Sequence, residues 1–146
     1  MNSKLRVFIA SAIDEDTTAG EGVRQRLKPL LEELGFEVLG AGIGDNPIIP
    51  TDSPRGTCKA IIRQDLIEQS SANITLVVTD ARTFAIGTWI EMWEGYRQGQ
   101  FVIVLAEGEA YPKSIFLKGL ADIVVHTEAE LISILRDLIP KGGENG

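Results

Sequence analysis

Three short segments of this chain are almost entirely apolar, at residues 7–10, 74–78 and 101–105. Each is too short for a core helix, and none alternates apolar with polar residues. Strands that are half exposed show such alternation, whereas continuous apolar strands are covered on both faces, as in parallel sheets. We therefore expect these three segments to be adjacent, parallel and buried.

Segments with helical periodicity separate the predicted strands. Strands are expected at residues 5–11, 36–39, 74–78, 101–106 and 123–125, and helical patterns cover residues 23–34, 61–68, 87–98 and 128–139. Strands that alternate with helices pair in parallel through right-handed crossovers. The sequence thus predicts an α/β fold, a flavodoxin-like three-layer sandwich with a five-stranded, mostly parallel sheet.

Glycine and proline mark the expected ends of these elements. Gly35 is placed to end the first helix, and Pro29 inside that helix predicts a kink or a break. Residues 43–56 contain three prolines and several small polar residues, which predicts a long loop, with Pro54 near the first turn of the next helix. Long loops within compact domains are often functional.

Length and composition narrow the classes of function. The 146 residues fit one domain over residues 1–146, with residues 141–146 expected to fray. The formal charge of −7 and the absence of a basic cluster argue against a nucleic-acid polymer as partner. Cys58 and His126 are the only cysteine and histidine, which disfavours disulfides, most zinc sites and a Ser–His–Asp triad. With no signal peptide or membrane span in the sequence, we expect a cytoplasmic protein.

Candidate functional residues come after the predicted strands. In such sheets ligands bind at the carboxyl ends of the strands. The residues expected to contact a ligand lie after the first strand, after the third strand and at the start of the next helix: Ser11, Ala12, Ile13, Asp80, Gly87 and Thr88. Glu91 falls one turn into that helix, where it can point at the cleft. Position alone also allows a first-turn acid that merely favours the helix dipole.

At this point a family resemblance emerges. The order and spacing of several short motifs resemble the nucleoside 2-deoxyribosyltransferase superfamily, which includes the nucleoside 5′-monophosphate N-glycosidases. The motifs are the opening strand at residues 7–11, Asp65-Leu66, Ala72-Asn73-Ile74, Val77-Val78, Gly87-Thr88 and Glu91.

The resemblance implies a double displacement at an anomeric carbon. Glu91 would be the nucleophile, and Asp65 the second carboxylate, which binds the sugar or helps to protonate the leaving base. It implies a nucleoside or nucleotide as ligand, with neither a metal nor an organic cofactor, and water or a second base as acceptor. It also implies a homodimer or higher homo-oligomer. The helix carrying Trp89, Met92, Trp93 and Tyr96 has enough large apolar residues to form the interface.

Three positions depart from the family pattern. Phe8 stands where the family usually has a tyrosine that orients the nucleophile, and Ala85 stands where an Asp or Ser often contacts the sugar 5′ group. Trp93 replaces a glycine. Phe8 and Ala85 favour a rival hypothesis, a non-catalytic nucleotide-binding or sensing module. A third interpretation is a flavodoxin-like domain that binds another phosphate ligand, although the usual Gly-rich loop after the first strand is absent.

Overall fold

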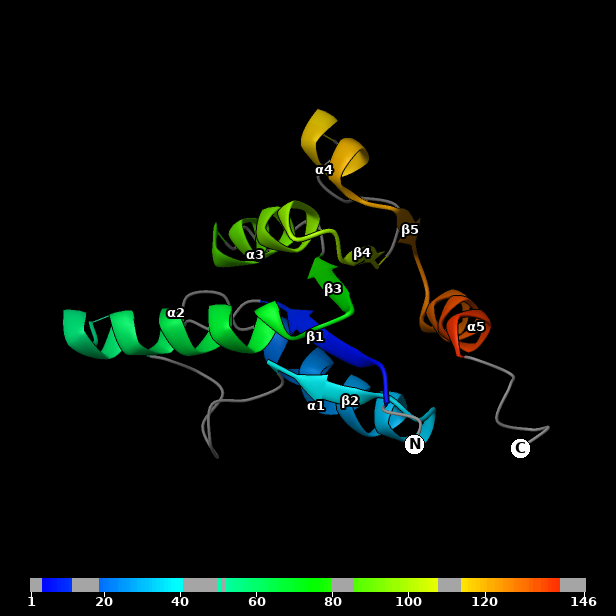
Figure 1. The fold of residues 1–146 in the computed structure, drawn as a ribbon, viewed down its shortest axis with the longest axis horizontal. Coiled ribbons are helices and arrows are strands. Elements are labelled where there is room, and N and C mark those ends of the chain that lie inside the picture. Colours follow the sequence, from blue (N-terminus) through cyan, green and yellow to red (C-terminus); the bar gives the residue numbers. More distant parts are fainter. Residues whose placement is uncertain are drawn as a thin grey trace.

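The computed structural model describes residues 4–11, 19–40, 50, 52–79, 86–107 and 114–139, and for residues 19–23 only the backbone. The strands are β1 (Arg6–Ala10), β2 (Glu37–Leu39), β3 (Ile74–Thr79), β4 (Phe101–Ala106) and β5 (Ile123–Val125). The helices are α1 (Ala19–Glu33), α2 (Arg55–Ser70), α3 (Ile86–Arg97), α4 (Ile115–Leu120) and α5 (Glu128–Leu138). Figure 1 shows their arrangement.

The five strands form one sheet in the order β2-β1-β3-β4-β5, and all four pairings are parallel. The register places Val7 beside Ile74 and Ile74 beside Phe101. The prediction that the three apolar segments are adjacent, parallel and buried is therefore confirmed, as is the α/β flavodoxin-like fold.

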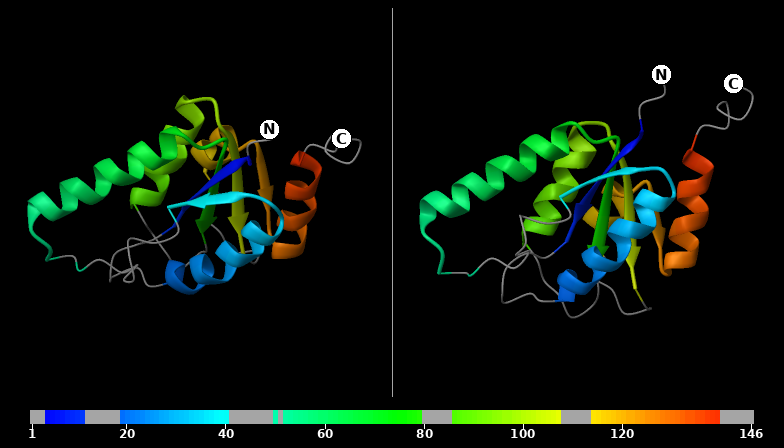
Figure 2. Two further views of the ribbon diagram at one scale, coloured as in Figure 1. Left: turned by 60° about the horizontal axis from the view of Figure 1, so that its bottom comes forward. Right: turned by 90° about the horizontal axis from the view of Figure 1, so that it is seen from below.

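Helices cover both faces of the sheet and make three layers (Figures 1 and 2). On one face Leu27 and Leu31 of α1 and Leu131 and Leu135 of α5 pack in a core cluster with Ile9 and other sheet residues. On the other face the core cluster joins Phe8 and further sheet residues to Met92 of α3 and Leu117 of α4. Coverage of both faces explains why apolar residues predominate in the central strands.

Helix α1 ends where the sequence predicts and shows no break at Pro29. Gly35 ends it as predicted: with φ +102° it lets Gly35 N–H bond to Glu32 O and Phe36 N–H bond to Leu31 O. Pro29 lies inside α1 without breaking it. A proline removes only one helical N–H, here the donor to the Gln25 carbonyl, and packing of the Leu27 and Leu31 face keeps the helix intact.

Two further expectations need correction. Helix α2 begins at Arg55 directly after Pro54, which occupies its N-cap, so the loop predicted over residues 43–56 is two residues too long. Helix α4 has no counterpart among the predicted helices; it begins where the Ser114 hydroxyl accepts a hydrogen bond from Leu117 N over 2.9 Å. Residues 41–49 of the predicted loop and the tail at 141–146 lie outside the described residues.

The strand order sets the position of a ligand crevice. The chain leaves β1 for β2 on one side and then crosses to β3 on the other, so the order reverses between β1 and β3. In open parallel sheets, ligands bind at this switch point, outside the carboxyl ends of the strands.

Among the residues that the structure describes, no helix has the length and apolarity required to cross a membrane.

Candidate active site

Three helices bring charged side chains together near the switch point. Glu91 comes from α3, Asp65 from the middle of α2, and Arg24 from α1. The charges of Asp65 and Arg24 act on the pKa of Glu91, that of Arg24 acts on the pKa of Asp65, and both carboxyls act on the pKa of Arg24. Ser11 comes directly after β1 and is buried. The two carboxylates predicted from the sequence therefore do belong to one cluster, together with a cation that the sequence analysis did not identify.

Glu91 is largely buried in the second turn of α3. Burial raises the pKa of its carboxyl to about 8; the nearby Asp65 charge raises this pKa further, whereas the Arg24 charge lowers it. A first-turn acid that only complemented the helix dipole would be exposed and would not have a raised pKa. The environment of Glu91 is thus typical of a functional carboxyl rather than of a solvated helix face.

Asp65 is half-buried on α2. Burial raises the pKa of its carboxyl to about 6, Glu68 on the same helix raises it as well, and Arg24 lowers it. Two interacting carboxyls give up their protons in two steps that belong to the pair. Between about pH 6 and 8 the pair therefore holds one proton and one negative charge.

Arg24 is buried, with only 1% of its surface exposed. Its Nε donates to Ser11 Oγ over 2.5 Å and its Nη2 donates to the Ser11 carbonyl over 2.8 Å. Burial lowers the pKa of Arg24, and the charges of Glu91 and Asp65 act in the opposite direction. Arg24 thus joins the end of β1 to the charged cluster.

A buried polar network fixes the backbone of α3 at Glu91. Gln69 Nε2 donates to the Glu91 carbonyl over 2.6 Å and to Thr75 Oγ1 over 3.1 Å. Thr75 Oγ1 donates to Gln100 Oε1, and Gln100 Nε2 donates to the Gln69 carbonyl, each over 2.6 Å. The network ties α2, β3, α3 and the start of β4 together, because buried polar groups in a low-dielectric interior need partners.

The residues predicted to bind the ligand fall into two groups. Ser11, Gly87 and Thr88 are described: Ser11 Oγ accepts from Arg24, and nothing lies within 4 Å of the point where a Gly87 Cβ would stand. Thr88 is buried, and its hydroxyl has no partner in the described part of the chain. Their role in binding stays a prediction. Ala12, Ile13 and Asp80 lie outside the described residues, as does Ala85.

Phe8 lies in the core and not in the carboxylate cluster. Its side chain is 1% exposed and packs with Val77 and Met92. A Cβ on Gly40, which has φ +69°, would lie 2.7 Å from the Phe8 ring, so glycine is required there. The Phe8 side chain has no hydroxyl and therefore donates no hydrogen bond.

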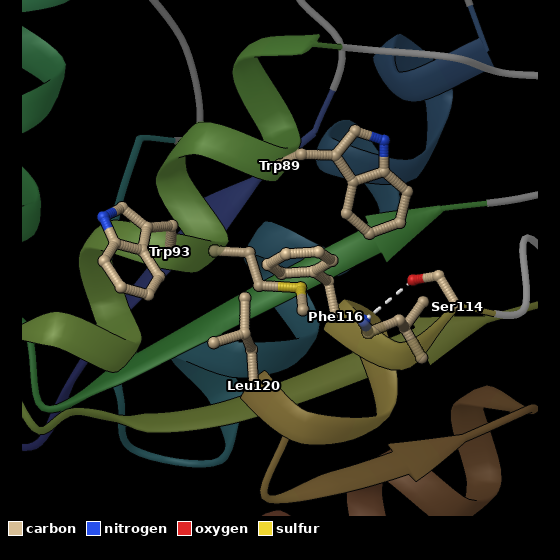
Figure 3. Close-up of a pocket in the computed structure, with 7 residues that line it drawn as sticks. Trp89, Trp93, Ser114, Phe116 and Leu120 are labelled. Carbon is tan, nitrogen blue, oxygen red and sulfur yellow. Dashed lines mark hydrogen bonds between the residues drawn. The ribbon is translucent and has the colours of Figure 1, made fainter.

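A concavity lies between α3 and α4. It is a pocket of about 360 Å³ lined almost wholly by apolar side chains, with Trp89 and Trp93 from α3 and Phe116 and Leu120 from α4 (Figure 3). None of the three charged residues of the cluster lines this pocket.

Within the described ranges, no three His, Cys, Asp or Glu side chains are grouped so that they could hold a metal ion.

Known proteins resemble this chain in structure but not detectably in sequence. The sequence matches no protein-family model and no curated protein. A 2-deoxyribosyltransferase from Bacillus psychrosaccharolyticus is similar in structure, with a TM-score of 0.68 and 15% identity over 86% of this chain and 89% of that one. A CMP N-glycosidase from Clostridium botulinum gives a TM-score of 0.60 and 19% identity over 89% and 97% of the two chains.

The same fold also occurs in proteins of another kind. A response regulator from Thermotoga maritima gives a TM-score of 0.51 and 16% identity over 92% of this chain and 99% of its own. Identities this low establish the fold alone, and one fold serves many functions. The two nucleoside-processing structures agree with the resemblance to the nucleoside 2-deoxyribosyltransferase superfamily, and the function has to be argued from the site.

Proposed function

We propose that this protein cleaves or transfers the N-glycosidic bond of a nucleoside or nucleoside 5′-monophosphate, with Glu91 as nucleophile. The observation that carries the proposal is that two partly buried carboxyls beside the switch point, Glu91 and Asp65, both have raised pKa values, with the Asp65 charge acting on Glu91. The structural similarity to a 2-deoxyribosyltransferase and a CMP N-glycosidase supports it.

In the first step a Glu91 carboxylate oxygen attacks the anomeric carbon. A glycosyl–Glu91 ester forms as the bond to the base nitrogen breaks, and the electron pair of that bond leaves with the base. A proton from Asp65 neutralises the departing base. In the second step water or another base attacks the same carbon, Asp65 takes up the proton of the attacking molecule, and the carboxylate of Glu91 is released, so that the configuration is retained.

The ionisation of the pair fits this chemistry. Near neutral pH it holds one proton, and the reaction needs one anionic and one protonated carboxyl. The resting proton favours Glu91, whose carboxyl has the higher pKa, so the attack requires the proton to move to Asp65 or to the base. The reverse roles, with Asp65 as nucleophile, fit the resting ionisation as well, and single substitutions at each position separate the two assignments.

A non-catalytic sensing module is the rival function. Phe8 favours it, because no hydroxyl from β1 reaches Glu91, and the response-regulator likeness shows that this fold serves signalling proteins. A sensor would bind a nucleotide and release no base.

We also propose that the protein works as a homodimer or higher homo-oligomer. Helices α3 and α4 expose large apolar side chains: Trp93 is 48% exposed and Phe116 74%. Contiguous apolar surface of this kind beside an apolar pocket is typical of an interface. Because α3 carries both Trp93 and Glu91, assembly there would also stabilise the helix that carries the nucleophile.

Incubation of the protein with a panel of nucleosides and 5′-monophosphates tests the function. Chromatography of the products is expected to show a free base from at least one compound, or a new nucleoside when a second base is added. Binding without base release from every compound would favour the sensing module.

A further inference from the structure

Gln69 is buried although its side chain is polar. Among the residues of α2, all of which the structure describes, it alone is buried, with 0% of its surface exposed. Its amide nitrogen, Nε2, donates to the main-chain carbonyl of Glu91 over 2.6 Å and to Thr75 Oγ1 over 3.1 Å. A side chain without exposed surface cannot contact a ligand. Any influence of Gln69 on a reaction therefore passes through the groups that it binds.

The two partners determine how the Gln69 amide is oriented. A main-chain carbonyl can only accept, so the Glu91 carbonyl must face the amide nitrogen. Thr75 Oγ1 gives its single proton to Gln100 Oε1 over 2.6 Å, so it too must accept from Gln69. An amide turned the other way would place two oxygens against each other at Glu91. The direction of each of these hydrogen bonds is therefore fixed.

The amide oxygen shows that the two donated protons are what this position needs. Gln69 Oε1 is buried, and it has no hydrogen-bond partner in the described part of the chain. A buried acceptor without a partner destabilises a fold, and a leucine or methionine at this position would avoid that loss. A residue that only filled the core would therefore be apolar. We attribute the amide to its bonds with Glu91 and Thr75.

The same turn of α3 is also held at Gly95, four residues after Glu91. A Cβ added at Gly95 would lie 2.6 Å from Thr75 Oγ1 and 2.9 Å from Thr75 Cβ, so the α3 backbone lies directly against β3. Residues 91–95 are thus restrained from two sides, by Gln69 of α2 and by Thr75 of β3. Gln69 in turn lies one helical turn after Asp65.

We propose that Gln69 is a positioning residue: through its bond to the Glu91 carbonyl, it fixes the turn of α3 that carries Glu91 relative to the turn of α2 that carries Asp65. The inference rests on the proposed function for its catalytic meaning. A displacement of about 1 Å from the attack geometry can slow a reaction about 10²-fold. Binding of the substrate depends less on this placement, so kcat rather than KM should respond.

The test replaces the amide and keeps the shape. Gln69→Met has a side chain of the same length and lacks both donors; its kcat for base release is expected to fall about ten- to hundredfold, with KM little changed. Leu131→Ala is the control for lost stability, because Leu131 is buried in the core cluster on the opposite face of the sheet. Its kcat is expected to stay near the wild-type value at a temperature where both variants are folded.

Three results would overturn the proposal. The first is a wild-type kcat in folded Gln69→Met, whether or not KM rises. The second is an equal loss of kcat in Leu131→Ala, which would assign the effect to stability alone. The third applies where Gln69→Met does not fold. Gly95→Ala displaces the same turn of α3 and keeps the amide, so an unchanged kcat in Gly95→Ala would show that the position of this turn does not set the rate.

A second measurement separates this proposal from the proposed function. Amide hydrogen exchange should be faster in α3 of Gln69→Met than in wild-type α3, whereas Leu131→Ala should affect α5 more. If the wild type releases no base, the function fails, but unchanged exchange in α3 of Gln69→Met would still refute the positioning role. If base is released and Gln69→Met keeps the wild-type kcat, the function stands and the role of Gln69 is wrong.

Discussion

Gln69 Nε2 donates a 2.6 Å hydrogen bond to the main-chain carbonyl of Glu91. Gln69 lies four residues after Asp65, on the same face of α2. The bond therefore fixes the helix that carries Asp65 against the helix that carries Glu91. A buried amide thus restrains the two helices that carry the carboxyls.

The network around Gln69 leaves no room for a larger residue at Gly95. A Cβ added there would lie 2.6 Å from Thr75 Oγ1 and 2.9 Å from Thr75 Cβ. Gly95→Ala is expected to lower the free energy of unfolding by about 1–3 kcal/mol, because α3 must move away from β3. Gly119→Ala on α4 is the control, since nothing lies within 4 Å of its added Cβ. Denaturant unfolding measures both, and equal stability of the two variants would contradict the packing described.

The raised pKa of Glu91 makes stability depend on pH. Between its ordinary value of 4.5 and about 8, the folded protein holds a proton that the unfolded chain has released. The free energy of unfolding should therefore fall as pH rises through this range, by at most about 1.4 kcal/mol per pH unit from this group. Asp65 adds a smaller fall between 3.8 and about 6.

Glu91→Gln removes the ionisable group and should remove most of this fall above pH 6. The free energy of unfolding of the wild type and of Glu91→Gln is measured with denaturant at about pH 5, 7 and 9. These values bracket the two shifted pKa values. The variant is expected to exceed the wild type in stability at the highest pH; parallel curves would show that Glu91 ionises as an exposed carboxyl does.

Asp65→Asn tests the role of the second carboxyl. Loss of a general acid is expected to slow base release by about 10²–10⁴-fold. The loss should be much smaller with a nucleotide whose base is already cationic through N-methylation, because such a base leaves without taking a proton. An equal loss with both substrates would instead assign Asp65 to the attack or to sugar binding.

The exposed apolar surface on α3 and α4 predicts self-association. Phe116 is 74% exposed beside the apolar pocket, and Phe116→Glu places a charge where a partner would pack. Sedimentation at micromolar concentration is expected to show at least a dimer for the wild type and a smaller species for Phe116→Glu. Arg136→Glu on α5, across the sheet, is the control. A monomeric wild type would refute this prediction.

Elements that depend on local pattern are predicted well from the sequence. The largely apolar segments at 7–10, 74–78 and 101–105 predict the central strands because coverage on both faces favours apolar residues at nearly every position. The short helix α4 has six residues, too few for a helical period to appear, and it begins at a Ser114 cap that looks like an ordinary loop serine.

The site is harder to predict, because its parts meet only in three dimensions. Glu91 and Asp65 are identified by resemblance, but the pKa values of their carboxyls are set mainly by burial in the folded chain, and the charge of Arg24 lowers both. The helical spacing of the sequence does indicate that Arg24 is buried. Residues 24, 27 and 31 fall on one face of α1, and Leu27 and Leu31 are buried there. A charge on an apolar helix face requires a buried partner, yet nothing in the sequence indicates that charges from α2 and α3 act on it.

The role of Glu91 as nucleophile is decided by comparing base release by the wild type and by Glu91→Gln from the same nucleotide, with ligand affinity measured in parallel. Glutamine resembles the resting, protonated Glu91 in shape and charge, so affinity should change little. The attacking oxyanion is lost, however, and base release should fall by several orders of magnitude. Base release by Glu91→Gln at a rate near that of the wild type would contradict the proposed mechanism, because Glu91 could then not be the nucleophile.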